Sequence, residues 1–265
     1  MTRRPGVIDA YDEIKEEYMK IAVITGGNRG VGKSTAINVA KHGVGVILTY
    51  NSHAEEAERV VSEIEKNGRK AVALKLDVSK TSSFGDFAAL VEQALQNEWK
   101  QKTFDYLVNN AGIAQRTMIK DLSEDLFDQL VNVHFKGPVF LTQKLLPLMS
   151  DGGHVVNIST AMTRVASPAG TSIYSSAKGA MEVFTRFVAR EFLERKIRCN
   201  IVAPGALDTD FGGGRTDEMR KRMGETATTG RMGQAQDIGP LIAALLSDGF
   251  LWVDGQRIEA TGGPS

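Results

Sequence analysis

Tyr174 and Lys178 form the residue pair whose types and spacing best fit proton transfer. On a helix, positions i and i+4 lie on one face, about one turn apart. An ammonium group beside a phenol stabilises the phenolate, and it lowers the tyrosine pKa from its usual value of about 10. Such a phenol can protonate a carbonyl oxygen while the carbon is reduced. The pair therefore predicts acid–base chemistry on a carbonyl or an alcohol.

The elements that must position this pair follow a regular alternation. From residue 20 onward, short β-branched segments alternate with longer amphipathic segments, which is typical of βα units on a parallel sheet. The predicted strands are residues 21–25, 44–50, 71–76, 104–109, 154–159, 198–202 and 256–260. Helices are predicted near residues 33–42, 83–98, 123–149, 174–194 and 236–247, with a further helix between a capping box at 52–55 and Gly68. The sequence therefore predicts an α/β fold with a seven-stranded parallel sheet.

A glycine-rich turn lies between the first predicted strand and the first predicted helix. Glycines let backbone N–H groups approach a phosphate, and the helix N-terminus adds a positive dipole. Residues 27–34 match the P-loop pattern of nucleotide triphosphatases, in which Lys33 would bind phosphate and Ser34 would bind magnesium. Residues 25–32 instead have the Thr-Gly-x-x-x-Gly-x-Gly spacing of a dinucleotide-binding turn. The turn alone does not decide between the two functions.

The P-loop interpretation also requires an apolar strand that ends in an aspartate for the magnesium shell. Asp77 is the one candidate, and it follows a strand that Lys75 interrupts. Other predicted strands end in Asn109 or Ser159. The P-loop interpretation is therefore poorly supported, and it is kept as an alternative from a different functional class.

Further motifs follow the glycine turn in a fixed order. Asn-Asn-Ala-Gly at 109–112 follows the fourth predicted strand, and Asn132 lies in the next helix. Tyr-Ser-Ser-Ala-Lys at 174–178 opens a later helix, and Pro-Gly at 204–205 follows the sixth strand. In order and approximate spacing, over residues 20–263, this set resembles the short-chain dehydrogenase/reductase family. The likeness is to its 3-oxoacyl-acyl-carrier-protein reductase and glucose dehydrogenase members.

The resemblance implies a set of catalytic residues. They are Asn132, Ser159, Thr160, Tyr174 and Lys178. In the family, a hydroxyl after the fifth strand polarises the carbonyl, and an asparagine holds a water that connects the lysine to solvent. Thr160 is favoured as the hydroxyl because it lies fourteen residues before Tyr174. Its methyl group would crowd the carbonyl, so Ser159 stays open as the alternative.

The resemblance also implies a bound dinucleotide. The residues expected to contact it are Gly26, Asn28, Arg29, Gly30, Val31, Gly32, Asn51, Ser52, Asp77, Val78, Asn109, Ala111, Gly112, Tyr174, Lys178, Pro204, Gly205 and Thr209. An acidic residue at the end of the second strand would favour NAD, and this strand ends in Asn51 and Ser52 instead. Arg29 could reach a 2′-phosphate. We therefore expect NADP(H) to be preferred over NAD(H).

The predicted domain organisation is simple. A single doubly wound Rossmann domain over residues 20–265, with helices on both faces of the sheet, follows an extension of residues 1–19. Residues 206–232 break the alternation and contain three consecutive glycines, Gly212–Gly214. We expect this segment to be a lid over the substrate, with a short helix at 216–223.

Composition excludes several functional classes. The 265 residues carry 32 basic and 32 acidic side chains, so no bulk charge favours nucleic acid or an anionic membrane. One cysteine and four histidines argue against a disulfide framework or a metal site. We expect a cytoplasmic enzyme with a small carbonyl or alcohol substrate, and the resemblance implies a homotetramer. A dinucleotide sensor without turnover is a further alternative, which the intact Tyr174–Lys178 pair argues against.

Overall fold

Seven parallel strands form the centre of the computed structural model, which describes residues 18–166 and 168–263. The strands are β1 Ile21–Ile24, β2 Gly45–Tyr50, β3 Ala71–Lys75, β4 Phe104–Asn109, β5 Met149–Ile158, β6 Arg198–Pro204 and β7 Arg257–Ala260. They pair in the order β3-β2-β1-β4-β5-β6-β7, and every pairing is parallel. The strand order changes direction between β1 and β4, which is where ligands bind in doubly wound sheets. The predicted seven-stranded Rossmann fold is confirmed.

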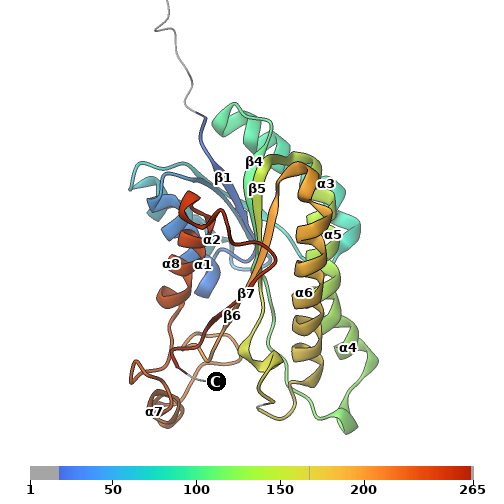
Figure 1. The fold of residues 1–265 in the computed structure, drawn as a ribbon, viewed down its shortest axis with the longest axis vertical. Helices are drawn as coiled ribbons and strands as arrows, with labels where there is room; N and C mark the ends of the chain where they lie inside the picture. The colour runs from blue at the N-terminus through green and yellow to red at the C-terminus, as the bar shows by residue number, and fades with distance from the viewer. Residues whose placement is uncertain (1–17, 167, 264–265) are drawn as a thin grey trace, which may run out of the picture.

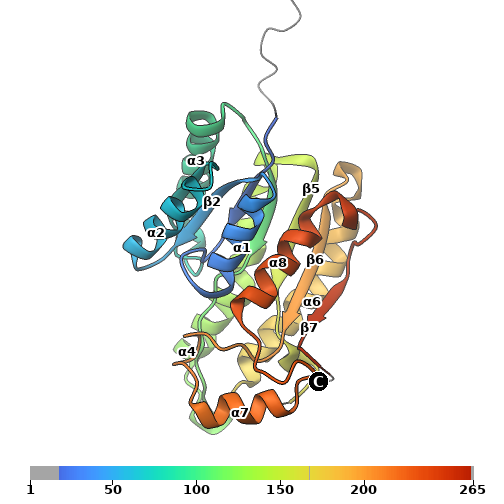
Figure 2. The ribbon, with the colours of Figure 1, turned by 90° about the vertical axis from the view of Figure 1, so that its left-hand side faces the viewer.

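Helices cover both faces of this sheet (Figures 1 and 2). They are α1 Gly30–Lys41, α2 Ala54–Glu65, α3 Phe84–Ala94, α4 Glu124–Val131, α5 Gly137–Leu145, α6 Ser172–Glu191, α7 Asp217–Glu225 and α8 Ala235–Leu246. Short 3₁₀ helices occupy Thr81–Ser83, Ile119–Asp121, Leu146–Leu148, Ala161–Thr163, Leu193–Arg195 and Asp248–Phe250, and π-helical turns occupy Leu95–Trp99 and Asn132–Lys136. Helices α1, α2 and α8 lie on one face, and α3, α5 and α6 lie on the other.

Alternation along the strands divides the core into two layers. Ala22 and Ile24 belong to the apolar cluster that includes α1, α2 and α8. Ile21 and Val23, between them, belong to the cluster that includes α3, α5 and α6. All four residues are fully buried. Strands covered on both faces carry nearly continuous apolar sequence, which explains why the β-branched segments located them correctly.

Three local expectations were wrong. The helix predicted at 123–149 is divided by the π-helical turn Asn132–Lys136, and β5 already begins at Met149 rather than at residue 154. A side chain on Gly137 would place its Cβ 2.0 Å from the carbonyl oxygen of Val78, so this close approach fixes the path of the chain. The capping box at 52–55 is also absent, because α2 begins after His53, which has φ 60° and no side-chain capping bond.

The described chain begins at Tyr18, inside the segment expected to be an extension. The Tyr18 hydroxyl donates to Asp105 Oδ1 at 2.6 Å. The backbone of Met19 pairs with the side-chain amide of Gln101 through bonds of 3.1 and 3.0 Å. These bonds fix the entry into β1, while residues 1–17 lie outside the described residues. Within 18–166 and 168–263, no helix is long and apolar enough to cross a membrane.

Candidate active site

The glycine turn after β1 has the geometry of a dinucleotide cradle. Gly26 and Gly30 have φ of 63° and 55°, in the left-handed region that favours glycine. A Cβ on Gly32 would lie 2.1 Å from the Gly26 carbonyl oxygen, so a side chain cannot be accommodated there. The Thr25 hydroxyl ties the turn to the end of β4, because it accepts from the backbone N–H of Ala111 at 3.0 Å. No acidic residue occupies the first turn of α1, so its N-terminus suits a pyrophosphate.

Lys33 and Ser34 do not form a triphosphate site in this structure. Lys33 forms an ion pair of 3.0 Å with Glu63 of α2. The Ser34 hydroxyl lies in the contact between α1 and α8, where it would be 2.2 Å from a Cβ on Gly239. Both side chains therefore serve helix packing, and the P-loop alternative is not favoured.

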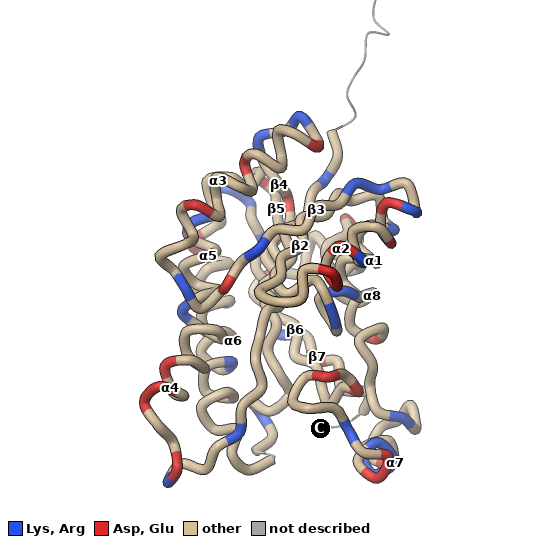
Figure 3. The backbone as a smooth tube through the Cα atoms, turned by 180° about the vertical axis from the view of Figure 1, so that it is seen from behind, with Lys and Arg blue, Asp and Glu red and all other residues tan. Residues whose placement is uncertain are grey.

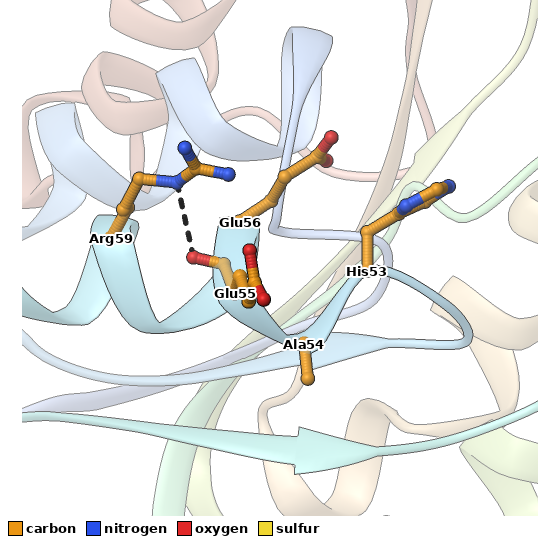
Figure 4. Close-up of a pocket in the computed structure, with 5 residues that line it drawn as sticks. All are labelled: His53, Ala54, Glu55, Glu56 and Arg59. Atoms are coloured by element: carbon orange, nitrogen blue, oxygen red, sulfur yellow. Dashed lines mark hydrogen bonds between the residues drawn. The ribbon is translucent and has the colours of Figure 1, made fainter.

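The far side of the turn carries the residues expected to read a 2′-phosphate. Arg29 is exposed at the N-cap of α1, and Asn51 and Ser52 are exposed after β2. Glu56 reaches the turn from the first turn of α2 and accepts from Asn28 Nδ2 at 2.9 Å. A surface depression beside these residues is lined by His53, Ala54, Glu55, Glu56 and Arg59 (Figure 4). Among the described residues, the carboxylates that line this depression are those of Glu55 and Glu56. Both belong to α2, and neither lies at the end of β2.

Asp77 and Val78 follow β3. The Asp77 carboxylate accepts from the backbone N–H of Ser79 at 3.0 Å and from its hydroxyl at 2.6 Å, which fixes a tight turn. Val78 is buried, and its carbonyl faces the backbone of Gly137. Both residues are therefore held rigidly where the resemblance expects an adenine contact.

The side chain of Asn109 is hydrogen-bonded to other buried side chains of the protein. It is buried at the end of β4, and its amide nitrogen donates to Asn157 Oδ1 at 2.9 Å and to the Thr142 hydroxyl at 3.1 Å. Beyond it, Ala111 is half-buried and Gly112 is exposed. Their backbone, more than the Asn109 side chain, lies open for a ligand.

The last predicted cofactor residues follow β6. Pro204 ends the strand, and Gly205 passes so close to β7 that a Cβ would lie 2.9 Å from Thr261 Cα. Thr209 is half-buried in the segment that leads to Phe211. The Phe211 ring lies 6.3 Å from the ring of Tyr174. This segment therefore passes directly over the candidate catalytic tyrosine.

One face of α6 meets the end of β5. The Thr160 hydroxyl lies near enough to Tyr174 to act on its pKa, and it accepts from the backbone N–H of Met162 at 3.3 Å. Four residues after Tyr174, Lys178 Nζ donates to the carbonyl oxygen of Ile158 at 2.6 Å. The Ser159 hydroxyl points elsewhere and donates to Glu182 Oε1 at 2.5 Å. The structure thus brings Thr160, Tyr174 and Lys178 together and leaves Ser159 outside the group.

Burial controls the ionisation of the central pair. Burial raises the pKa of Tyr174 to about 12, and the hydrogen bond from Thr160 acts in the opposite direction. Burial lowers the pKa of Lys178 to about 8. The expected lowering of the tyrosine pKa is therefore not observed in the chain alone. The physical reason is that desolvation of the phenol outweighs the effect of Thr160, while the Lys178 ammonium is bonded to a backbone carbonyl instead.

His134 was missed by the sequence analysis. Its ring meets the Tyr174 ring edge-on at 4.8 Å, and its Nε2 is 2.8 Å from the carbonyl oxygen of Ile113. Burial, with a smaller contribution from the charge of Lys178, lowers the pKa of His134 to about 3, so the ring is neutral. Asn132 begins the π-helical turn that carries His134. The wider π-helical turn changes the direction in which His134 points. A sequence pattern with a 3.6-residue period does not predict this change.

Comparisons with known proteins identify the family of this chain. A family model described as enoyl-(acyl carrier protein) reductase matches residues 26–265. The tetrahydroxynaphthalene reductase of Pestalotiopsis fici is 31% identical over 257 residues, which cover 92% of this chain and 91% of that protein.

Two solved structures share the fold. The angucycline C-6 ketoreductase LanV, with bound NADP, has a TM-score of 0.87 and 32% identity, over 92% of this chain and 95% of that one. The promiscuous reductase LugOII, which catalyses a keto-reduction in lugdunomycin biosynthesis, has a TM-score of 0.87 and 31% identity, over 92% and 97%. This chain belongs to the short-chain dehydrogenase/reductase family, and it is an NAD(P)-dependent oxidoreductase.

Proposed function

We propose that this protein reduces a ketone with NADPH, or oxidises the corresponding alcohol in the reverse direction. The observation that carries the proposal is the position of Thr160, Tyr174 and Lys178. They gather at the carboxyl ends of the parallel strands, on the same edge as the glycine turn. Ligands of doubly wound sheets bind at this edge, and function follows from the site built there.

Each side chain has a distinct role in the proposed reaction. Tyr174 gives its phenolic proton to the carbonyl oxygen, and Thr160 donates a second hydrogen bond to that oxygen. A phenol with a pKa of about 12 is protonated at neutral pH, which is the form that reduction needs. Lys178, with a pKa of about 8, is mostly charged and stabilises the phenolate left behind. A bound nicotinamide would supply the hydride.

The residues present fit NADP(H) better than NAD(H). The glycine turn leaves no room for side chains where a pyrophosphate would lie, and Arg29 stands exposed beside it. Asn51 and Ser52, rather than a carboxylate, follow β2, and Glu56 of α2, which reaches the turn, is engaged by Asn28. The related reductase LanV has NADP bound. The other residues proposed to contact the cofactor are those predicted from the sequence, with the backbone of Asn109 in place of its side chain.

The substrate is proposed to be a ketone or a 3-oxoacyl compound. The related enzymes are named for hydroxynaphthalene and angucycline compounds, so aromatic polycyclic ketones are the first substrates to test. Residues 206–232 are proposed as a lid over this substrate, since Phe211 lies above Tyr174. Asn132 is proposed to support the lysine through water.

The proposal includes a homotetramer in the cytoplasm. Large apolar side chains are exposed on α5, α6 and the segment before β7, including Phe140, Phe187 and the fully exposed Trp252. Exposed apolar patches of this kind are typical of subunit interfaces. The one cysteine, Cys199, is buried and unpaired, which suits a reducing compartment.

One experiment tests the function. Purified protein is offered NADPH and a panel of aromatic polycyclic ketones, simple ketones, 3-oxoacyl thioesters, quinones and sugars, and absorbance is followed at 340 nm. We expect turnover with at least one ketone. Cofactor binding without turnover on any member would favour a dinucleotide sensor. Magnesium-dependent ATP binding that Lys33→Ala abolishes and NADPH does not displace would restore the P-loop alternative.

A further inference from the structure

An ion pair that is largely shielded from solvent, Glu182–Arg257, lies behind the proposed catalytic hydroxyl. Glu182 Oε1 accepts three hydrogen bonds, from the Ser159 hydroxyl at 2.5 Å, the Thr163 hydroxyl at 2.7 Å and Arg257 Nε at 2.8 Å. The side chains of Glu182 and Arg257 are only 12% and 7% exposed. Arg257 also reaches the carbonyl oxygen of Thr160 at 3.3 Å. The pair thus contacts both residues that follow β5.

The charge of Glu182 fixes the direction of these bonds. Burial acts to raise the pKa of this carboxyl, but hydrogen bonds from Ser159, Arg257 and Thr163 lower it below the usual value overall. An ionised carboxylate only accepts hydrogen bonds, so the Ser159 hydroxyl must point its proton at Glu182. A serine held in this way cannot donate to a substrate carbonyl.

Because Ser159 and Thr160 are consecutive residues of an extended chain, the side on which Ser159 lies determines the side on which Thr160 lies. Consecutive residues of an extended chain point to opposite sides. Thr160 has φ −158° and ψ 152°, which is extended backbone, and it therefore points away from the side that Ser159 occupies. Its hydroxyl, and not that of Ser159, acts on Tyr174.

We propose that Glu182 and Arg257 are positioning residues, which hold Ser159 out of the active site and fix Thr160 as the hydroxyl beside Tyr174. This inference rests on the proposed reductase function. It assigns a role to two residues that belong to α6 and β7 and that do not themselves touch the reacting atoms. Glu259 completes the arrangement, because its carboxylate forms an ion pair of 2.6 Å with the other side of Arg257.

A double-mutant cycle tests the proposal. In the wild-type background, Thr160→Ala should lower kcat by at least ~100-fold, as for the loss of one donor to a developing oxyanion. Glu182→Ala removes the group that positions Thr160, so the same Thr160→Ala change should then cost less than ~10-fold, because the hydroxyl it deletes is already out of place. Equal costs in the two backgrounds would overturn the proposal.

A second variant guards against a folding defect. Removing Glu182 alone leaves a buried arginine with one carboxylate fewer, whereas Glu182→Leu with Arg257→Met removes both charges together. The double replacement should fold, bind NADPH with unchanged affinity in a fluorescence titration, and show a kcat reduced ~10-fold or more. A crystal structure should show the Ser159 hydroxyl in a new rotamer. Wild-type kcat in this folded variant, or an unmoved Ser159, would overturn the proposal.

Arg164→Ala is the matched control. Arg164 forms an ion pair of 3.2 Å with Glu259, but its side chain is 61% exposed and it lies outside the catalytic group. Arg164→Ala should retain wild-type kcat and KM. A loss of kcat as large as that of the Glu182 variants would mean that removing any charge near Glu259 lowers activity, and it would overturn the specific role of Glu182. Wild-type protein without turnover on the ketone panel refutes the proposed function, whereas an active wild type with additive Thr160 and Glu182 effects refutes only this inference.

Discussion

The end of β5 and the segment 206–232 face the same candidate site, but they are built in opposite ways. At the end of β5, Lys178 donates a hydrogen bond to the carbonyl oxygen of Ile158, and Glu182 accepts one from Ser159. These side chains are little exposed to solvent. In the other segment, Gly212–Gly214 adopt φ of 82°, 90° and 77°, and Phe211 is 40% exposed. The difference teaches that the proposed chemistry is fixed by packed elements, while the proposed contact with substrate is left to a backbone with greater conformational freedom.

Charge separates the two regions in the same way. The Glu182–Arg257 pair is largely shielded from solvent, whereas Arg220 of α7 pairs with Asp208 and Arg231 pairs with Asp237 of α8 at exposed positions. Charges of both signs are distributed over the surface (Figure 3). Water and salt screen exposed pairs, so they contribute little, whereas breaking a buried pair is strongly destabilising. Because Arg220 and Arg231 are already paired with aspartates, they add little attraction for an anionic substrate.

The largest effect should follow from removing the phenol in the rigid region. Tyr174→Phe keeps the ring against His134 but removes the proton donor, so kcat should fall by more than ~10²-fold while NADPH still binds. Steady-state kinetics and a fluorescence titration measure the two quantities. Tyr18→Phe is the control, because it removes a tyrosine hydroxyl that is bonded to Asp105 and not to the catalytic group. This variant should stay active. A Tyr174 variant that keeps most of its kcat would remove this residue from the mechanism.

The second effect concerns the cost of burying Lys178. Lys178→Met should lower kcat and weaken NADPH binding, because the ammonium serves both the phenol and the proposed ribose contact. The same change should stabilise the fold at pH 7 by about 1–3 kcal/mol, since the pKa is depressed from 10.5 to about 8 by burial. Chemical denaturation and isothermal titration calorimetry measure the two effects. Unchanged NADPH affinity would exclude the ribose role.

The pH dependence gives the sign of that stability change. Below pH 8, Lys178 is charged in both the folded and unfolded chains, so the burial cost is fully present. Between pH 8 and 10.5 the unfolded chain holds the proton that the folded chain has lost, so stability rises with pH. The advantage of Lys178→Met should therefore shrink over this window. An advantage that is constant from pH 7 to pH 10 would contradict the buried ammonium as its source.

The same two regions mark how much the sequence could predict. The strands were located because burial on both faces demands apolar, β-branched segments, and the glycine turn because its backbone conformations demand glycine. The break at Asn132–Lys136 depends on the contact of Gly137 with Val78, which only the folded chain brings together. Likewise Glu182 and Arg257 are 75 positions apart, and no local pattern relates them.

The third effect tests the exposed edge of the glycine turn. A charge-assisted hydrogen bond from Arg29 to a 2′-phosphate, of about 1.5–3 kcal/mol, corresponds to roughly 10- to 100-fold preference for NADPH. Arg29→Ala should lower kcat/KM for NADPH by this factor and leave the value for NADH nearly unchanged. Arg59→Ala, in the neighbouring depression, is the matched control for loss of positive charge. A preference that survives Arg29→Ala undiminished would place phosphate recognition elsewhere.

The smallest effect should come from the glycine-rich segment, where each contact is weak. Phe211→Ala removes a half-exposed ring above Tyr174, so KM for the ketone should rise several-fold, by about 1 kcal/mol for an exposed aromatic contact, with kcat less affected. Hydrogen exchange over residues 206–232 should slow when cofactor and substrate are both present, because a closing lid protects its backbone N–H groups. Exchange within β5 should not change, since that strand is already paired on both sides. Exchange over 206–232 that is slow in the free protein and unaffected by ligands would make this segment as rigid as β5, and the contrast between the two regions would disappear.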